Sequence, residues 1–375
     1  MNITFSARTA GPTDSRFQQQ RPVASPQSGR ARLLGRSTVL SIVLVGGLIA
    51  LRFASGTAHL GNGTLQAEPS GIVKIQRSLM GTLWGVEVVD HGRPEAARKA
   101  IESAYAELTR LDNLMSEWKP ESPISQVDAA AGKHFVEVPA ELRELLQRSI
   151  HYSEITEGTF DITWRGMGNI WHFDDTFAVP SKEAVEKARR NIDYRKIRIE
   201  GNSVYLPAGS NIGLGGIAKG YAIDRAAGML KQAGFIDSLV DGGGDVLVSG
   251  TKNGEPWHLG IQDPRREHGE VLGVAALTNR ALVTSGDYER FRIVNGVRYH
   301  HIIDPRTGWP ATAAISVTVL SNTAEQGVVL GKGIFMLGPE KGLALARYQG
   351  VEAMVVDSQQ KQYFTEGFRR AYESR

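Results

Sequence analysis

The glycine-rich stretch Asn211–Gly250 holds the residues best suited to chemistry. It reads as a glycine-rich loop around Lys219, a helix, a strand, and a second glycine-rich loop between Asp241 and Asp245. Glycine permits positive φ and close approach of a ligand to the backbone, and helix N-termini bind anions. One such loop indicates a tight turn more often than a ligand site. Two loops joined by one helix favour a phosphate-bearing ligand.

Acidic and histidine side chains late in the chain form a second group of candidates. Asp287 and Glu289 follow a predicted strand at 282–285, and composition alone leaves a ligand site and a solvated turn equally open. His300 and His301 are expected to face opposite sides, because side chains alternate along a strand. Such a histidine is more often structural than catalytic. Aromatic residues that could stack on a planar ring, although burial is their commoner fate, are Trp118, Phe160 and Trp171.

Generic nucleotide motifs do not explain these residues. The segment 213–218 matches the G-x-G-x-x-A variant of the dinucleotide fingerprint, but the preceding strand is short and interrupted by Pro207. Lys219 is followed by Gly220 rather than by Ser or Thr, which excludes a Walker A loop. A Rossmann oxidoreductase is therefore a weakly supported hypothesis, and it predicts binding of NAD(P)H.

The segments that must position these residues mix strand and helix patterns. Strands are predicted at 71–76, 82–89, 196–200, 203–206, 257–262, 271–277, 282–285, 291–294, 298–303, 314–320 and 352–357. Besides the helix after Lys219, helices are predicted at 95–115, 139–156, 181–191, 323–337 and 339–348, with a loop around Pro120 and Pro123. The lack of regular βαβ alternation predicts an α+β fold rather than a doubly wound sheet.

The N-terminal part has a different composition from the rest. Residues 1–36 are rich in Arg, Gln, Ser and Pro, which predicts a disordered tail. The uncharged apolar run Ser37–Leu51 lies between Arg36 and Arg52, so 37–52 is predicted to be a signal peptide or membrane anchor that exports the remainder of the chain. A buried helix is the alternative, and cleavage and anchoring both stay open. A linker at 53–70 would precede one folded domain at 71–375.

Composition excludes several classes of function. The chain has no cysteine, which rules out disulfides, thiolate metal sites and a cysteine nucleophile. Residues 1–60 hold seven arginines and one acid, whereas the whole chain has a net charge of +3. The remainder is therefore slightly acidic and has no basic footprint for nucleic acid.

Taken together, these residues resemble the ApbE family of FAD:protein FMN transferases. The resemblance spans about Val73 to Val356. It rests on the order and spacing of many motifs, which are Met80-Gly81-Thr82, Met115-Ser116-Glu117-Trp118, Gly158-Thr159-Phe160-Asp161, Gly215–Asp224, Gly242–Asp245, Thr284–Arg290 and His301–Gly308.

The resemblance implies an α+β fold of the T-fold-like type, with mostly antiparallel sheets and packed helices. It implies cleavage of FAD, attachment of FMN through a phosphoester to a Thr or Ser of an exported flavoprotein subunit of a membrane redox complex, and release of AMP with Mg²⁺ assisting. Carried over by motif position, the FAD-binding residues are Met80, Trp118, Thr159, Phe160, Asp161, Gly213, Lys219 and Ile303. His301 matches a general base or phosphate contact, and Asp287 matches an acid close to the site. An exported, periplasmic enzyme fits the predicted signal segment.

The chain departs from the family pattern at the metal positions, which are Gly216, Val328 and Lys332. Members usually carry an aspartate where this chain has Gly213, and an Asp and a Thr where it has Val328 and Lys332. Valine and lysine offer no oxygen ligand to a hard cation. Lys332 is either a solvated helix residue or an inward-facing amine that partly replaces the metal charge. The alternative function is therefore an FAD-binding carrier or assembly factor that has lost transfer.

Overall fold

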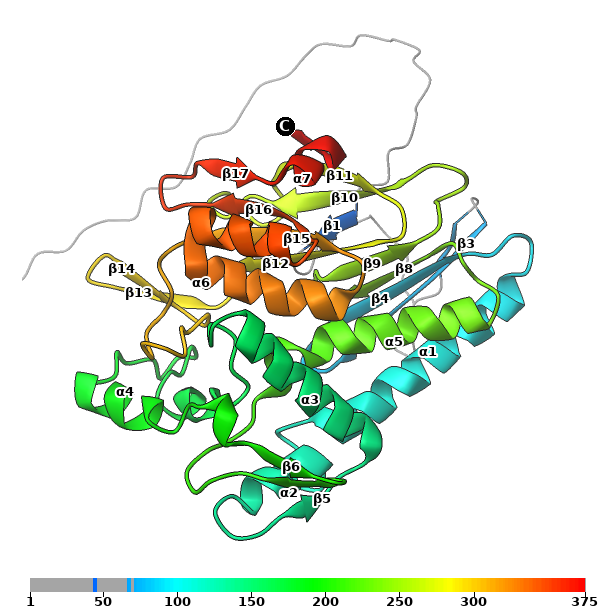
Figure 1. Cartoon of the computed structure of the whole chain (residues 1–375). Coiled ribbons are helices and arrows are strands. Elements are labelled where there is room, and N and C mark those ends of the chain that lie inside the picture. The colour runs from blue at the N-terminus through cyan, green and yellow to red at the C-terminus, as the bar shows by residue number, and fades with distance from the viewer. Residues whose placement is uncertain (1–42, 46–65, 69–70, 375) are drawn as a thin grey trace, which may run out of the picture. The chain divides into compact units, whose positions relative to one another are not determined.

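The computed structural model describes residues 43–45, 66–68 and 71–374, all within one compact unit, Ser41–Arg375 (Figure 1). The predicted tail at 1–36 and nearly all of the predicted signal segment and linker lie outside the described residues. Two short strands precede residue 71, namely β1 (Val43–Val45) and β2 (Gln66–Glu68). No helix among the described residues is both long and apolar enough to cross a membrane.

A nine-stranded sheet forms the centre of this unit, with strand order β17-β16-β15-β12-β9-β8-β4-β3-β2. Its strands after β2 are β3 (Ile72–Leu79), β4 (Thr82–Val89), β8 (Ser238–Gly242), β9 (Val246–Ser249), β12 (Arg280–Gly286), β15 (Ser316–Ser321), β16 (Glu352–Val356) and β17 (Gln362–Phe364). Each neighbouring pair is antiparallel. The predicted α+β class with mostly antiparallel pairing is thereby confirmed.

Three helices cover one face of the nine-stranded sheet (Figure 1). They are α1 (Pro94–Met115), α5 (Ala218–Gln232) and α6 (Ala324–Tyr348). Trp84 is fully buried beneath α1, and the Tyr105 hydroxyl donates to the carbonyl oxygens of Ile75 and Trp84, each at 3.0 Å. Burial of these large side chains is the main force that holds the helices on the sheet.

A four-stranded sheet, β1-β10-β11-β18, packs against the same central sheet. Its other strands are β10 (Trp257–Gln262), β11 (Val271–Leu277) and β18 (Tyr372–Ser374). Leu282 on β12 joins Leu259 and Leu277 in one apolar cluster, whereas its neighbours Ala281 and Val283 join the cluster beneath the helices. The alternation follows from the two-residue period of a strand and makes both faces of the sheet apolar.

Smaller elements complete the unit. They are α2 (Pro123–Ala129), α3 (Ala140–Ile155), α4 (Lys182–Arg189), α7 (Glu366–Ala371), the strands β5 (Val136–Glu137), β6 (Arg198–Glu200) and β7 (Ser203–Tyr205), and the hairpin of β13 (Phe291–Val294) and β14 (Val297–His300). Among them, α7 packs beside the four-stranded sheet.

Two local predictions were wrong. The expected loop around Pro123 contains helix α2, because Pro123 occupies its first turn and the Ser122 hydroxyl accepts a hydrogen bond from the Ser125 N–H. The predicted strand 298–303 ends at His300, where hairpin pairing with Phe291 stops. The break between the two helices predicted at 323–337 and 339–348 is confirmed, because Gly338, with φ of 75° and ψ of −172°, interrupts the helical backbone inside α6.

Candidate active site

Helices α5 and α6 meet at a close backbone contact that sets the geometry of the site. A Cβ on Gly220 would lie 2.5 Å from the carbonyl oxygen of Ala324, so only glycine lets the two backbones approach this closely. Asp224, one turn further along α5, accepts hydrogen bonds from the N–H groups of Ala324 at 2.7 Å and Glu325 at 2.9 Å. Burial raises the pKa of Asp224 to about 6. The start of α5 is thereby fixed beside α6.

The N-terminus of α5 carries no side-chain cap. Its N-cap residue is Ile217, and the short 3₁₀ turn η3 (Leu214–Gly216) leads into it. Lys219 lies in the first turn, and its Nζ is 2.8 Å from Oδ2 of Asp245. This ion pair places the first glycine-rich loop next to the second.

The second glycine-rich loop joins β8 to β9 and holds two carboxylates. Asp245 is buried, and its Oδ1 accepts a hydrogen bond from the Thr284 N–H at 3.3 Å. Asp241 accepts from the Gly244 N–H at 2.7 Å, and burial raises its pKa to about 6. The loop thus presents one carboxylate to Lys219 and uses the other to fix its own turn.

The three positions predicted from the family to bind metal are brought together. The Cδ atom of Lys332 lies 3.7 Å from where a Cβ of Gly216 would stand, and its Nζ donates to the carbonyl oxygen of Val328 at 3.2 Å. Lys332 is half-buried rather than solvated. Burial, with a smaller contribution from Lys219, lowers its pKa to about 8, whereas Asp245 acts in the opposite direction. The expectation of an inward-facing amine fits this placement.

These residues do not fit a divalent cation. The side chain of Val328 is apolar and buried, and the amine of Lys332 already donates to the carbonyl oxygen of Val328. Asp245 is already paired with Lys219. Across the described ranges, no three His, Cys, Asp or Glu side chains gather in a metal-binding arrangement. Hard cations such as Mg²⁺ require several oxygen ligands, so this donor set is unsuitable.

Gly213 lies where no larger side chain fits. A Cβ there would be 2.9 Å from Nε1 of Trp164 and 3.3 Å from Oε2 of Glu117. That Oε2 atom is buried without a hydrogen-bond partner in the described structure, although Arg165 Nε is 3.6 Å away. Burial raises the pKa of Glu117. A carboxylate therefore lies beside Gly213 even though residue 213 carries none.

The predicted FAD-binding segment Thr159–Asp161 also contacts this cluster. A Cβ on Gly216 would lie 2.8 Å from the ring of Phe160, and one on Gly333 of α6 would lie 3.3 Å from the Thr159 hydroxyl. The Asp161 carboxylate accepts from Thr163 and from the Tyr194 N–H, so it holds its own loop. Phe160 thus lies against the metal position Gly216, and Thr159 lies against Gly333, the residue after Lys332.

His300 and His301 have different environments, although β14 ends at His300 and strand alternation does not extend to His301. His300 is buried against Phe335 and pairs through Nε2 with the carbonyl oxygen of Ala311 at 2.8 Å, which is a structural role. His301 follows β14, and its Nδ1 is buried without a partner in the described part of the chain. Burial first, then the neighbouring His300, Arg290 and Lys332, lowers the pKa of His301 to about 3. The imidazole is neutral at physiological pH and has a lone pair free to accept a proton.

Asp287 lies in an ion pair rather than facing an open loop. Arg265 donates from Nη1 to Oδ1 and from Nη2 to Oδ2, both at 2.7 Å, and Arg298 Nε is 4.0 Å from Oδ2. Such a bidentate pair fixes both carboxylate oxygens. The structure therefore gives Asp287 a positioning role in its present state.

The remaining predicted FAD-binding and aromatic residues lie outside the cluster formed by Lys219, Asp245 and Lys332. Met80 occupies the β3–β4 turn with φ of 48°, and Trp118 is 81% exposed with the Arg165 guanidinium 5.5 Å from its ring centre. Ile303 is buried in a cluster with Trp171, whose indole Nε1 donates to the carbonyl oxygen of Gly308. Trp171 is thus structural, whereas Trp118 has a face available for stacking.

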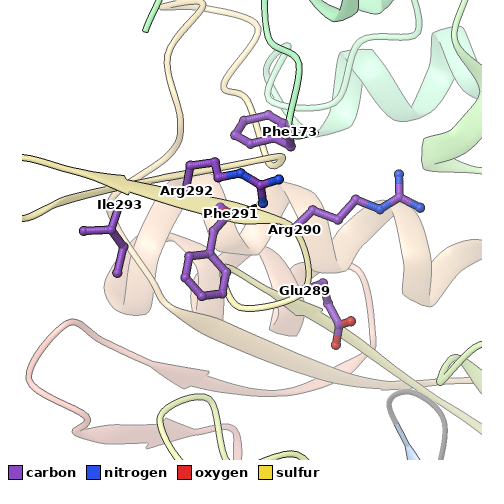
Figure 2. Close-up of a pocket in the computed structure, with 6 residues that line it drawn as sticks. All are labelled: Phe173, Glu289, Arg290, Phe291, Arg292 and Ile293. Carbon is purple, nitrogen blue, oxygen red and sulfur yellow. Dashed lines mark hydrogen bonds between the residues drawn. The ribbon is translucent and has the colours of Figure 1, made fainter. Parts of the chain in front are cut away.

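Two cavities flank the base of the β13–β14 hairpin. One of about 520 Å³ is lined by Phe173 and residues 289–293, and Figure 2 shows these side chains around the start of β13, with Phe173 contributed by a separate segment. The other, of about 510 Å³, includes Arg265, Tyr288 and Arg298. None of the predicted FAD-binding residues lines either cavity, so neither cavity coincides with the predicted FAD site.

Several residues that shape the site were not assigned a role from the sequence. Gly220 and Asp224 belong to the Gly215–Asp224 motif, but their task as a helix contact and a cap depends on α6, 100 residues away in the chain. Arg265 carried no signal at all, because its partner Asp287 is 22 residues away. Glu117 could have been suspected from its place in the Met-Ser-Glu-Trp motif.

Comparison with known proteins shows the family of this chain. The sequence model of the ApbE family matches residues 80–355. The FAD:protein FMN transferase of Treponema pallidum (strain Nichols) is 32% identical over 298 residues, covering 74% of this chain and 82% of the relative. That of Klebsiella pneumoniae (strain 342) is 30% identical, covering 78% and 87%. The crystal structure of an ApbE protein from Thermotoga maritima superposes with a TM-score of 0.75 at 30% identity, covering 81% of this chain and all of that one. The chain belongs to the ApbE family.

Proposed function

We propose that this protein is an FAD:protein FMN transferase. The observation that carries the proposal is the gathering of Lys219, Lys332, Asp245 and the unpaired Nδ1 of His301 around the open end of α5, in a chain of the ApbE family. The protein is a transferase, and FAD is its substrate.

The reaction requires the FAD pyrophosphate to be held while its bond is exchanged. The acceptor hydroxyl oxygen forms a bond to the FMN phosphorus, and the bond from that phosphorus to the bridging oxygen breaks. AMP leaves with that oxygen and its electron pair. Phosphoryl transfer of this kind depends mainly on positioning and charge stabilisation. The open N–H groups of α5 and the two ammonium groups suit the phosphate oxygens.

His301 is the side chain best placed to accept the hydroxyl proton. Its pKa of about 3 keeps it neutral, and the buried Nδ1 has no competing partner among the described residues. A low pKa makes it a weak base in the resting enzyme. The negative charge of a nearby pyrophosphate favours the protonated form, so substrate binding raises the basicity of His301 when it is needed.

The acceptor is proposed to be an exported flavoprotein subunit of a membrane redox complex, modified on a Thr or Ser. The support is the arginine-rich segment before the apolar block Ser37–Leu51, which is typical of an exported or membrane-anchored chain. The transferase domain would then act on the periplasmic side of the inner membrane.

The test combines the purified full-length chain with FAD and a candidate acceptor flavoprotein. Covalent flavin on the acceptor, detected by in-gel fluorescence, and stoichiometric AMP are the expected products. We expect His301→Gln to lower the rate by about 10²–10⁴-fold, because general-base catalysis contributes that much. His151→Gln is the matched control, since this histidine is exposed on α3 and pairs only loosely with Glu154 at 3.8 Å.

FAD binding without either product, in the presence and absence of Mg²⁺, would contradict transfer. The chain would then be an FAD carrier or assembly factor, the function that loss of the metal-binding residues favours. Equal rates for His301→Gln and the native chain would remove His301 from the chemistry while leaving the transferase assignment intact.

A further inference from the structure

Lys332 is the side chain that most clearly makes these residues unsuitable for a divalent cation, because it places an amine among the three metal positions. Its Cδ atom lies 3.7 Å from the Cβ position of Gly216, and its Nζ donates to the carbonyl oxygen of Val328. A lysine ammonium has three donor hydrogens, so two stay available after this bond. The amine therefore occupies the place among these three residues where a cation would be held.

The charge at positions 328 and 332 alone equals that of an Asp and Thr pair holding a divalent cation. An aspartate at residue 328 together with a divalent cation would give a net charge of +1. Valine at 328 and a protonated lysine at 332 also give +1. The nearby Lys219–Asp245 pair, with Nζ and Oδ2 2.8 Å apart, is neutral as a whole and leaves this balance unchanged. The two substitutions together thus remove the oxygen ligands and supply the missing charge.

We propose that the Lys332 ammonium replaces the divalent cation at the FAD pyrophosphate, so that this transferase binds FAD without metal. The inference rests on the proposed function, because it assumes that FAD binds at the open end of α5. The ammonium is attached to α6, whose start is fixed to α5 by Gly220 and Asp224. Its charge is thereby held in place without separate binding of an ion.

The test measures FAD affinity of the full-length chain by flavin fluorescence, in EDTA and in MgCl₂. We expect the two dissociation constants to agree within about 2-fold. Lys332→Met should weaken FAD binding in EDTA by about 10-fold or more, since a charged hydrogen bond to phosphate is lost. Riboflavin, which has no phosphate, should bind both proteins equally. Lys332→Arg should retain most of the affinity for FAD.

Two further variants complete the design. Lys341→Met, an exposed lysine on the same helix, is the matched control and should bind FAD like the native chain. The double variant Val328→Asp/Lys332→Thr restores two oxygen ligands, and its FAD affinity should increase at least about 10-fold on addition of Mg²⁺.

Native FAD affinity that is more than about 10-fold tighter in MgCl₂ than in EDTA would overturn the inference and leave the proposed function standing. Unchanged affinity in a folded Lys332→Met variant would overturn it equally. If Lys332→Met fails to fold, the comparison of native chain with the double variant decides, because only the latter should respond to Mg²⁺. Failure of the native chain to bind FAD in either buffer would overturn both the inference and the proposed function.

Discussion

The N-termini of α5 and α6 lie against each other, but side chains cap the first-turn N–H groups of α6 and not those of α5. At α6, the Thr323 hydroxyl accepts from the Gln326 N–H, and Asp224 accepts from the N–H groups of Ala324 and Glu325. At α5, no side chain caps the first turn. Both ends carry the positive pole of a helix dipole. Only the end at α5 has donors left for an anion, which identifies α6 as the support and α5 as the binding element.

The charges in the first turns show the same contrast. Glu325 in α6 is an acid at a positive helix end, where it stabilises the helix, and it pairs with Arg148 at 2.8 Å. Lys219 in α5 is a cation at a positive helix end, which is unfavourable by about 0.3–1 kcal/mol. Asp245 offsets this cost. A lysine kept at such a position is expected where a multiply charged anion binds.

The largest expected effect on stability comes from removing the Asp224 cap at the N-terminus of α6. Asp224→Ala leaves two N–H groups of α6 without an acceptor at a partly buried site, so we expect a loss of about 3 kcal/mol in the free energy of unfolding at pH 7. Urea unfolding followed by circular dichroism measures it. Thr323→Ala removes only one bond, of 3.3 Å, and should cost about 1 kcal/mol. Equal losses for the two variants would contradict the idea that Asp224 is the principal cap.

A smaller effect is expected from pushing the two helix ends apart. Gly220→Ala places a Cβ only 2.5 Å from the Ala324 carbonyl oxygen, and overpacking of this kind costs about 2 kcal/mol. Gly228→Ala in the same helix is the control, because a Cβ there meets nothing within 4 Å. It should stabilise the protein by about 0.5 kcal/mol, as alanine does in a helix. A thermal unfolding scan of both variants that gave shifts of the same sign would show that the two helices can separate at little cost.

The two helix ends also show which features could be predicted from the sequence and which could not. Strand β4 and the helix after Lys219 were predicted because their apolar periodicity is local. The phosphate-binding character of the glycine loops was predicted for the same reason, since it depends on glycine and on a helix start. The cap that Asp224 provides was not, because it serves N–H groups of residues about 100 positions away. Long-range pairing has no local signature.

The two departures from the family pattern show the same limit. The sequence revealed that Val328 and Lys332 lack oxygen ligands, but left the direction of the lysine open. Only packing against Gly216 decides that the amine points inward. Similarly, Gly213 revealed a missing carboxylate, whereas the carboxylate of Glu117 beside it became visible only once α1 and the Trp164 segment were folded together.

The smallest expected effect on stability concerns the hydrogen-bonded ion pair that joins the body of α5 to α1. Glu107 on α1 accepts hydrogen bonds from Arg110 at 2.8 Å and from Arg225 of α5 at 2.8 Å. Hydrogen bonding from Arg110, then from Arg225, lowers the pKa of Glu107 to about 2. A folded pKa below the unfolded value of about 4.5 adds stability that is fully present above pH 4.5 and is lost as the pH falls toward 2.

Because both arginines are nearly half exposed, solvent screening reduces this contribution to about 1 kcal/mol. The free energy of unfolding of Glu107→Gln should therefore fall below that of the native chain by about 1 kcal/mol at pH 7, and the gap should narrow at pH 3. Asp224 should show the opposite pH dependence, because its raised pKa makes its contribution to the free energy of unfolding decline as the pH rises from about 4 to about 6. Asp224→Asn therefore serves as the comparison. A gap for Glu107→Gln that stayed constant between pH 7 and pH 3 would mean that packing, rather than charge, joins α5 to α1. In that case the N-terminal end of α5 would be fixed by the Gly220 contact and the Lys219–Asp245 pair, and the rest of the helix by its apolar face.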